Sequence, residues 1–357
     1  MPTAVATGLQ ESRPRIAVSG RDHDALSGGL LNLLTCENVQ GLYRCEALFG
    51  NWGTKNGSTE FLYFDRQTLD FGKALAVKLG GEALFQGNVF GIEAHYPEGR
   101  APEVNILAED RFQDLRMTRR TRTFADVTDK DVIEQIANEH GLRPSVDLRG
   151  PQHKILAQVN QSDLAFLRER VRAVDGEIWI EGSTMHVQSH TQRREESLEL
   201  HYGSTLREFS VIADLAGQRT SVSVGGWDVS AKSQIKHEAT ESVVSGELNG
   251  GSSGASILSA AFGDRKESFA HTVPFTSQEA QAEAESIFRL SARRFIVGRG
   301  VAQADSRLRV GAFLNLDRLG PLFNGKYYVT EVRHLFDGIF GLRTQFTAER
   351  AGLGQEQ

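Results

Sequence analysis

Apolar and polar residues alternate with a period of two in two regions far apart along the chain. The alternation is clearest over residues 75–79 in the first region, and over residues 314–316 and 328–332 in the second. This is the period of a β-strand that buries one of its two faces. The pattern therefore predicts antiparallel β-structure in both regions.

The two regions also repeat each other. Residues 71–110 and 310–350 carry matching glycine, aromatic and acidic positions in the same order. The matched positions are Gly72 with Gly311, Leu84-Phe85 with Leu322-Phe323, Gly87 with Gly325, Glu93 with Glu331, and Ala108-Glu109 with Ala348-Glu349. A duplicated β unit indicates architecture and assembly rather than a reaction centre.

Two glycines, Gly87 and Gly325, are predicted to be structural turn residues. The dipeptide Asn324-Gly325 is typical of a two-residue hairpin turn of type I′, in which both central residues need positive φ. Gln86-Gly87 stands at the matching position of the first copy. We therefore expect these two glycines to be the least replaceable turn residues of the chain.

Between the copies, the period of the pattern changes to that of helices. Thr128, Ser162 and Thr276 stand where N-caps are expected, and Thr276 is followed by Glu279 as in a capping box. A β-hairpin is predicted over residues 177–188, with its turn at residues 182–183. The predicted helices cover residues 129–140, 163–174 and 277–295.

These elements predict a mainly β fold with an α+β insert: two related antiparallel β-barrels, a small α/β insert domain and one long helix in the second half. The first barrel is expected to take its last strands from beyond the insert. The predicted segments are an N-terminal flexible arm (1–13), the first barrel (14–114, completed by about 195–221), the insert (115–194), the second barrel (222–350) with a Gly/Ser-rich linker (238–256), and a tail (351–357).

Composition excludes several classes of partner. The chain has 357 residues, enough for two or three domains. Its 40 Lys and Arg against 46 Asp and Glu give a net charge of −6, which argues against nucleic acid or an anionic membrane as a partner. The N-terminus lacks the apolar stretch of a signal peptide, and nowhere do about 18 apolar residues follow one another. We therefore expect no signal peptide and no membrane insertion.

The cysteines and histidines give no metal site. Cys36 and Cys45 flank a predicted turn, so we expect two small buried apolar residues, with a cross-hairpin disulfide as the alternative. His186, His190 and His201 are close in sequence but lack the spacing of metal ligands on one helix face. Polar surface residues are the simpler interpretation of these histidines.

Three further patterns are weak candidates for chemistry. Residues 250–254 match the hydrolase pattern G-x-S-x-G, but they lie in a low-complexity stretch without a preceding buried strand. The basic run over residues 116–122 lacks interleaved aromatic residues, so a solvated or subunit-facing side is expected rather than a phosphate site. The pair Glu109-Asp110 would need a defined separation of its carboxyl groups to cleave a glycoside. The sequence therefore predicts no enzyme, no catalytic or cofactor-binding residue, no metal and no cofactor.

Four stretches together resemble a known family. Residues 108–142 resemble the entry to the insert domain of phage late-control gene D proteins, and residues 161–187 resemble the helix and hairpin that follow it. Residues 222–235 are similar to the crossing into the second barrel, and residues 322–336 to its closing strands. The resemblance covers residues 14–350 and identifies the chain as similar to contractile-tail baseplate hubs and to the hub portion of type VI secretion valine-glycine repeat spike proteins.

The resemblance implies a function in assembly. In such hubs two barrels resemble tail-tube subunits, so a homotrimer presents six barrels and adapts a hexameric inner tube to a trimeric spike. The implied partners are the inner tube or a tube-initiator protein, a separate spike or needle protein, and baseplate wedge proteins. The implied location is the bacterial cytoplasm during assembly, then the baseplate of a phage tail, tailocin, extracellular injection particle or type VI-like system.

Two alternatives come from other classes. A tail-associated peptidoglycan hydrolase or wall-binding protein is one, since the helix over residues 129–140, followed by a glycine and a short strand, loosely resembles small wall-binding modules. A tail-tube or tube-initiator paralogue is the other, and the two-copy pattern argues against it because those proteins carry one barrel.

Overall fold

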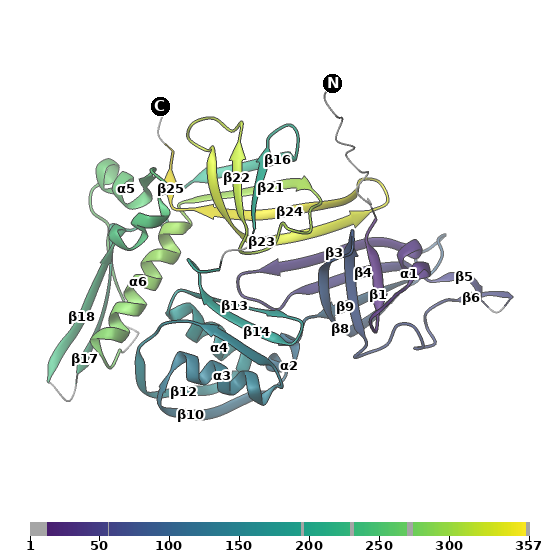
Figure 1. The fold of residues 1–357 in the computed structure, drawn as a ribbon, viewed down its shortest axis with the longest axis horizontal. Helices are drawn as coiled ribbons and strands as arrows, with labels where there is room; N and C mark the ends of the chain where they lie inside the picture. The colour runs from purple at the N-terminus through teal and green to yellow at the C-terminus, as the bar shows by residue number, and fades with distance from the viewer. Residues whose placement is uncertain (1–12, 56, 194–195, 229–231, 270–273, 355–357) are drawn as a thin grey trace, which may run out of the picture.

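The computed structural model describes residues 13–55, 57–193, 196–228, 232–269 and 274–354. These residues form four units, each around an apolar cluster of its own. We call them the N-terminal half-sheet, the insert, the C-terminal half-sheet and the α6 unit (Figure 1). The flexible arm expected over residues 1–13 lies outside the described residues except for Arg13.

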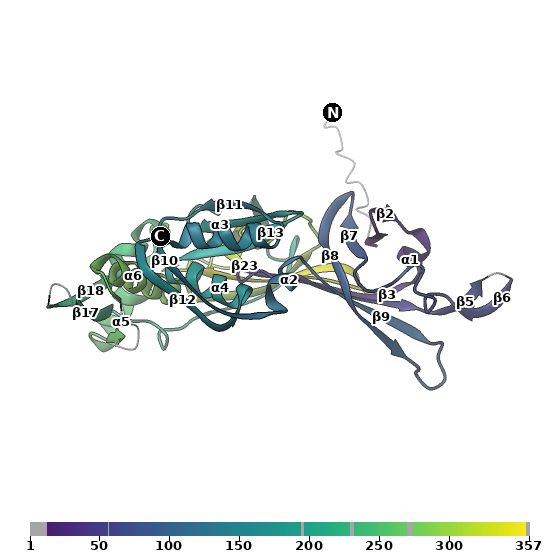
Figure 2. The ribbon, with the colours of Figure 1, turned by 90° about the horizontal axis from the view of Figure 1, so that it is seen from below.

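The N-terminal half-sheet forms because its strands alternate buried and exposed positions, as in the burial of Cys45, Ala47 and Phe49. Its elements are β1 (Arg15–Val18), β2 (Arg21–Asp22), α1 (Asp24–Gly29), β3 (Leu30–Asn38), β4 (Arg44–Gly50), β7 (Ala74–Leu79), β8 (Glu82–His95) and β9 (Glu103–Glu109). A separate hairpin, β5 (Trp52–Lys55) and β6 (Ser58–Phe61), projects from this unit (Figures 1 and 2).

The insert confirms the predicted helices and hairpin of this region. Thr128 caps α3 in a capping box with Asp131, and Ser162 caps α4. Its elements are α2 (Phe112–Arg116), β10 (Arg119–Thr128), α3 (Asp129–Glu139), β11 (Arg143–Asp147), β12 (Gln152–Ser162), α4 (Asp163–Ala173), β13 (Gly176–Glu181) and β14 (Thr184–Ser189).

The C-terminal half-sheet and the α6 unit divide the rest of the chain. The half-sheet contains β15 (Ser197–His201), β16 (Leu206–Ala213), β21 (Ile296–Gln303), β22 (Phe313–Asp317), β23 (Gly325–Asp337) and β24 (Gly341–Arg350). The α6 unit contains β17 (Ser221–Asp228), β18 (Ser233–Thr240), the 3-10 helix η1 (Glu241–Glu247), β19 (Ser252–Ser253), α5 (Gly254–Phe262), β20 (Lys266–Phe269), α6 (Ser277–Arg293) and β25 (Gly352–Leu353). The capping box of Thr276 and Glu279 opens α6 as predicted.

The two half-sheets merge into one 13-stranded sheet, in which β23 pairs with both β24 and β3. Because β23 continues from one half into the other, the described residues form no closed barrel, and the fold is mainly β with a curled, open sheet. The segment expected to complete the first half joins the second instead: β15 pairs with β22 and β16 pairs with β21.

Two further predictions about the chain's organisation are wrong. The expected linker over residues 238–256 is ordered as part of β18, η1, β19 and α5, and it buries Val244 and Ala255 against α6. The expected tail is partly paired, since Gly352 and Leu353 of β25 form a ladder with β19. The small residues of this stretch allow two backbone segments to pack closely and do not make the stretch flexible. A Cβ on Gly251, for example, would lie 2.5 Å from the carbonyl oxygen of Leu353.

The duplication is confirmed in the backbone hydrogen bonds. Gly72 N–H donates to Val89 O at 2.8 Å, and Gly311 N–H donates to Val329 O at 3.0 Å. Both glycines have positive φ. The pairing of β8 with β9 then shifts its register by one residue directly after Val89, and the pairing of β23 with β24 shifts in the same way directly after Val329. The two half-sheets therefore share a local geometry as well as a sequence pattern.

The pairing of Gly87 with Gly325 is wrong by two residues, and Gly87 is not a turn residue. Gly87 lies inside β8 opposite Leu75. In the second copy Leu314 corresponds to Leu75, and the residue opposite Leu314 is Tyr327. Gly87 therefore corresponds to Tyr327 and not to Gly325. The φ of Gly87 is not positive; the turn before β8 is made by Gly80 and Gly81. The glycine is needed for a different reason, since a Cβ at this position would lie 2.2 Å from the backbone oxygen of Glu109.

Gly325 does need its glycine, although its loop is longer than a two-residue turn. It has a φ of +128° at the start of β23, and a Cβ there would lie 3.0 Å from Nη1 of Arg350. We expect Gly325→Val to lower the free energy of unfolding by about 1–3 kcal/mol, because a β-branched residue is strained at this φ. Chemical denaturation measures this change. Gly338→Val is the control, since Gly338 has open space and no positive φ; equal losses in both variants would contradict the expectation.

The two cysteines do not form a disulfide. Both are free, and they lie on neighbouring strands with Cys45 opposite Thr35 and Cys36 opposite Arg44. Adjacent residues of a strand point to opposite faces, so the two thiols lie on opposite sides of the sheet. Burial raises the pKa of the Cys36 thiol, which therefore stays protonated near neutral pH.

Candidate functional site

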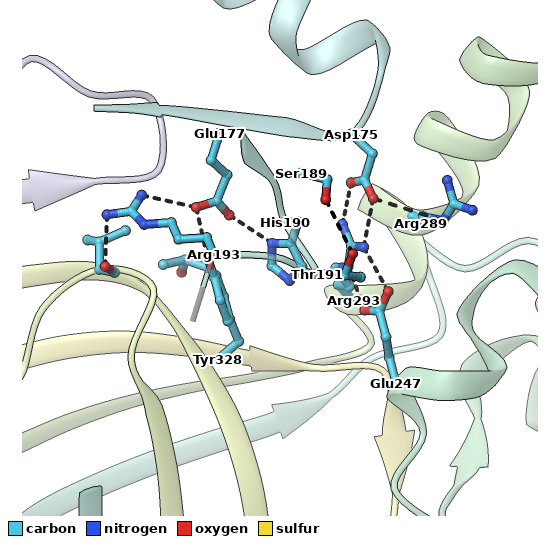
Figure 3. A network of polar contacts seen from close by, with 12 residues as sticks. Asp175, Glu177, Ser189, His190, Thr191, Arg193, Glu247, Arg289, Arg293 and Tyr328 are labelled. Carbon is cyan, nitrogen blue, oxygen red and sulfur yellow. Dashed lines mark hydrogen bonds and ion pairs between the residues drawn. The ribbon is translucent and has the colours of Figure 1, made fainter. Parts of the chain in front are cut away.

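A network of buried charges lies where the four units meet (Figure 3). We call it the junction network and define it as Asp175, Glu177, His190, Arg193, Glu247, Arg289, Arg293 and Tyr328. Most of these side chains come from the ends of secondary-structure elements rather than from their centres. Figure 3 shows two groups of contacts, one around Glu177 and one around Arg293.

Arg193 connects three units in the first group. Its Nη1 donates to Glu177 Oε2 of the insert at 3.0 Å, and its Nη2 donates to Val310 O of the C-terminal half-sheet at 2.9 Å. Nη2 also donates to the Tyr43 hydroxyl of the N-terminal half-sheet at 3.3 Å. The guanidinium lies 4.0 Å from the ring centroid of Trp179. With 2 % of its surface exposed, Arg193 is a buried cation held by several partners.

Glu177 is the matching anion. The Tyr328 hydroxyl donates to its Oε2 at 2.7 Å, and Nδ1 of His190 lies 2.7 Å from its Oε1. Burial alone would raise the pKa of this carboxyl, but His190 and Arg193 outweigh the burial and hold the pKa below its usual value. The carboxylate is therefore charged at neutral pH and ties the insert to the C-terminal half-sheet.

Arg293, at the end of α6, organises the second group. It forms a two-point ion pair with Asp175 of the insert, in which Nη2 lies 2.8 Å from Oδ2, and a second pair with Glu247 of η1 at 2.6 Å and 2.8 Å. Arg289 lies 3.9 Å from Asp175 and pairs with Glu285. Separating the α6 unit from the insert would leave the charges of this buried group uncompensated, which costs free energy. The group therefore holds the two units together.

His153 forms a second clamp between the insert and α6. Its Nδ1 lies 2.6 Å from Oε1 of Glu279, and its Nε2 lies 3.2 Å from Oδ2 of Asp129, which also pairs with Arg170. Burial alone would lower the pKa of His153, but the hydrogen bonds to the two carboxylates raise it to about 9. Halfway along α6, Ser286 Oγ donates to Arg172 O at 2.6 Å.

We expect the stability of the protein to depend on pH through His153. Its pKa is higher in the folded chain than in the unfolded chain, so its contribution is complete below about pH 6.5 and is lost as pH rises through about 9. His153→Gln is expected to remove roughly 2 kcal/mol of stability at pH 7 and to flatten this part of the pH profile. Denaturant unfolding between pH 6 and pH 10 measures both effects. A profile identical to that of the wild type would contradict the assignment.

The insert, α6 and the C-terminal half-sheet line an open groove with a volume of about 1540 Å³. Its lining includes parts of the junction network, among them Asp175, Glu177 and Arg293. It also includes exposed positions on all three walls, such as Ile155 on β12 and Arg299 on β21. The junction network therefore sets the distance between the walls of this groove.

The acidic pair and the basic run of the sequence have structural roles. Oε2 of Glu109 accepts a hydrogen bond from Nε of Arg116 at 3.0 Å. The carboxylate of Asp110 accepts the backbone N–H groups of Tyr43 and Phe112, and burial raises its pKa to about 7. Further along the basic run, Arg122 donates to Glu139, Gln158 and Asp163, so its charge is compensated inside the insert.

The histidines singled out from the sequence have separate partners. His186 stacks on Trp179 with ring centroids 5.2 Å apart, and Nδ1 of His201 lies 2.8 Å from Asp317. Among the residues that the structure describes, no group of three or more His, Cys, Asp or Glu side chains could hold a metal ion. The G-x-S-x-G match is preceded by η1 instead of a buried strand; its serine, Ser252, lies in β19 opposite Leu353, and the next residue, Ser253, caps α5.

Comparisons with known proteins agree with the fold. The model of the family described as the Alg8 N-terminal domain matches residues 55–337. No curated protein matches the chain. The 43 kDa tail protein of prophage MuSo2 from Shewanella oneidensis has a TM-score of 0.70 at 10% identity, covering 95% of this chain and 98% of that one.

Two further solved structures have the same fold. A tail protein from Neisseria meningitidis MC58 has a TM-score of 0.66 at 10% identity, covering 96% of this chain and 97% of its own. An Escherichia coli component of the type VI secretion system, described as structurally similar to T4 bacteriophage tail proteins, has a TM-score of 0.55 at 12% identity. That alignment covers 92% of this chain and 76% of the other. The expected likeness to baseplate hubs is confirmed, at the level of fold. Within the described part of the chain, no helix has the length and apolar character needed to cross a membrane.

Proposed function

The chain belongs to the Alg8 N-terminal domain family, and we propose that it is the central structural hub of a contractile tail or injection-system baseplate. In this proposal three copies form a ring, and each copy contributes two half-sheets that act as barrel-like equivalents of tube subunits. Six such units then face a hexameric tube on one side, while the threefold ring receives a trimeric spike on the other.

The observation that carries the proposal is the duplicated hydrogen-bond geometry. The same glycine-to-valine contact and the same register shift occur at Gly72 and Val89 and again at Gly311 and Val329. A chain with two equivalent half-sheets lets a closed threefold ring present six similar surfaces. The junction network supports this role, because a hub must hold its two halves at a constant angle under load.

The proposed partners are further copies of the chain, an inner tube or tube-initiator protein, a spike and baseplate wedge proteins. The proposed place of assembly is the bacterial cytoplasm, followed by incorporation into the particle. We assign the chain no reaction: Glu109, Asp110 and His190 take part in structural contacts, and Ser252 lies in the β19–β25 ladder opposite Leu353.

Mass photometry of the purified chain, alone and with its spike partner, tests the proposal. We expect a trimer in at least one of the two samples. A monomer in both samples at micromolar concentration would count against a hub. Release of muropeptides from purified cell walls would instead favour the tail-associated hydrolase.

A further inference from the structure

Two strand edges of the main sheet are open in a single chain. At one end of the sheet, β16 pairs with β21 on one side and with no described strand on the other. In the N-terminal half-sheet, β8 pairs with β7 only as far as Asn88. Its last residues, 91–95, therefore have β9 on one side and no described strand on the other. Such edges leave backbone N–H and C=O groups without a strand partner.

The C-terminal half-sheet shows which strand covers the equivalent of this open part of β8. The hairpins β8–β9 and β23–β24 match residue for residue, since Val89 lies opposite Ala108 and Val329 lies opposite Ala348 at the same spacing. The end of β23 therefore corresponds to the open end of β8, and it pairs antiparallel with β3 (Figure 1). The same stretch of strand is thus covered in one half-sheet and open in the other.

The open strand β16 is the counterpart of β3. The register of β3 opposite β4 shifts by one residue between Leu30 and Asn32, and that of β16 opposite β21 shifts in the same way between Leu206 and Glu208. The inner strands match as well, because β4 pairs with β9, and β21 pairs with β24, without a shift. The strands β3 and β16 therefore occupy the same place in the two half-sheets.

The contact that joins the half-sheets within one chain is formed by β23 and β3, and their counterparts β8 and β16 are the two open edges. We propose that β8 of one chain pairs with β16 of the next chain, so that the sheet continues from chain to chain. The contact is heterologous, and it closes into a ring when the rotation between chains is a simple fraction of a turn. This inference rests on the proposed function, since it names the strands that hold the ring together.

The contact within the chain also predicts the register of the contact between chains. Val39 N–H donates to Thr330 O at 3.1 Å where β3 meets β23. Hydrogen-bonded and non-hydrogen-bonded pairs alternate along an antiparallel ladder, so Cys36 and Arg333 form a non-hydrogen-bonded pair. The equivalent pairs between β8 and β16 are Ile92 with Ala213, Glu93 with Ile212, Ala94 with Val211, and His95 with Ser210.

Both edges are suited to this pairing. β16 contains no proline, and the side chain of Ile212 is 58% exposed. The open part of β8 also lacks proline and has exposed residues at Glu93, Ala94 and His95. Because a long open edge promotes uncontrolled pairing with other chains, natural proteins cover or block such edges. Pairing of β8 with β16 covers both edges with one contact.

Disulfide crosslinking tests the strand pairing and its register. In a Cys36→Ser background, Glu93→Cys is combined with Ile212→Cys, and the purified protein is oxidised with copper phenanthroline. A non-hydrogen-bonded pair brings the two Cα atoms to about 4.5 Å, within reach of a disulfide. We expect covalent dimers and trimers on a non-reducing gel. The matched control combines Glu93→Cys with Arg207→Cys, because Arg207 is exposed on the same strand but lies roughly 16 Å further along it.

Mass photometry of the same samples separates this inference from the proposed function. Trimers without a crosslink specific to the Glu93 and Ile212 pair would overturn the strand pairing, leave β16 to a different partner and leave the hub proposal standing. A chain that stays monomeric and uncrosslinked at high micromolar concentration would overturn both. Crosslinked open chains of more than three copies would support the strand pairing and overturn the closed ring.

A charge substitution gives an independent measurement. Ile212→Glu places a second carboxylate directly opposite Glu93, and like charges in this arrangement destabilise a strand pair, so we expect self-association to weaken about tenfold. Adding Glu93→Lys is expected to restore most of the loss, because the pair then has opposite charges. Ile155→Glu on β12 is the control, since Ile155 is 59% exposed and should leave self-association unchanged. Equal weakening by Ile212→Glu and Ile155→Glu, or no recovery in the double variant, would overturn the inference.

Discussion

Replacing Arg193 with methionine is expected to lower the free energy of unfolding by about 3–5 kcal/mol, because it removes the buried arginine that pairs with Glu177 and leaves this carboxylate with His190 and Tyr328 alone. The variant also loses the hydrogen bonds to Tyr43 and Val310 and the contact with the Trp179 ring. Methionine keeps most of the side-chain volume, so the loss reflects charge and hydrogen bonding rather than a cavity. Denaturant unfolding at neutral pH measures the change.

Arg307→Met is the matched control for this prediction. Arg307 also pairs with a carboxylate, Asp305, at 2.7 Å, but its side chain is 57% exposed. Exposed pairs contribute about 0–1 kcal/mol, so the control should change little. If the two variants lost similar amounts of stability, the junction network would not be the connection between the units that its geometry indicates.

The same group of residues predicts how stability changes in acid. The pKa of Glu177 is lower in the folded chain than in the unfolded chain. Its contribution is therefore present above the unfolded pKa, and it is lost as pH falls through the lower, folded value. His153 acts at the opposite end of the range, so together these two contributions are largest at mildly acidic pH, below about pH 6.5 and above the unfolded pKa of Glu177.

Local signals in the sequence predicted the elements well. The N-cap expected at Thr128 and the capping box at Thr276 placed the starts of α3 and α6, because a cap depends on residues that are neighbours in the chain. The duplication was also visible, since two copies of one strand pattern keep their glycines where the backbone requires them. Gly72 and Gly311 are the clearest case.

The junction network could not be predicted in the same way. Glu177 and Tyr328 are 151 positions apart, and Asp175 and Arg293 are 118 apart. Each is an ordinary charged or aromatic residue that belongs to no periodic pattern and no motif. The merging of the half-sheets was missed for a similar reason: the pattern of β23 shows that it is a strand, but not that its second half pairs with β3. The linker predicted over residues 238–256 is wrong because small residues allow close backbone packing as well as flexibility.

Gly87 shows this ambiguity most clearly and gives the other large expected effect. We expect Gly87→Ala to destabilise the protein by about 3 kcal/mol, at the upper end of the usual cost of overpacking. The added Cβ would lie 2.2 Å from the backbone oxygen of Glu109 and 2.6 Å from Cζ of Phe85. A backbone atom cannot move aside as a flexible side chain can, so β8 and β9 would have to separate.

Gly50→Ala in β4 is the control for Gly87→Ala. A Cβ at Gly50 meets no atom within 4 Å, and its φ is not positive. We expect this change to be neutral or slightly stabilising, because alanine restricts the unfolded chain more than glycine does. Thermal and denaturant unfolding of the two variants measure both changes in stability. If Gly87→Ala were tolerated as well as Gly50→Ala, the close approach of β8 to β9 at this point would be wrong, and with it the reason that glycine is required there.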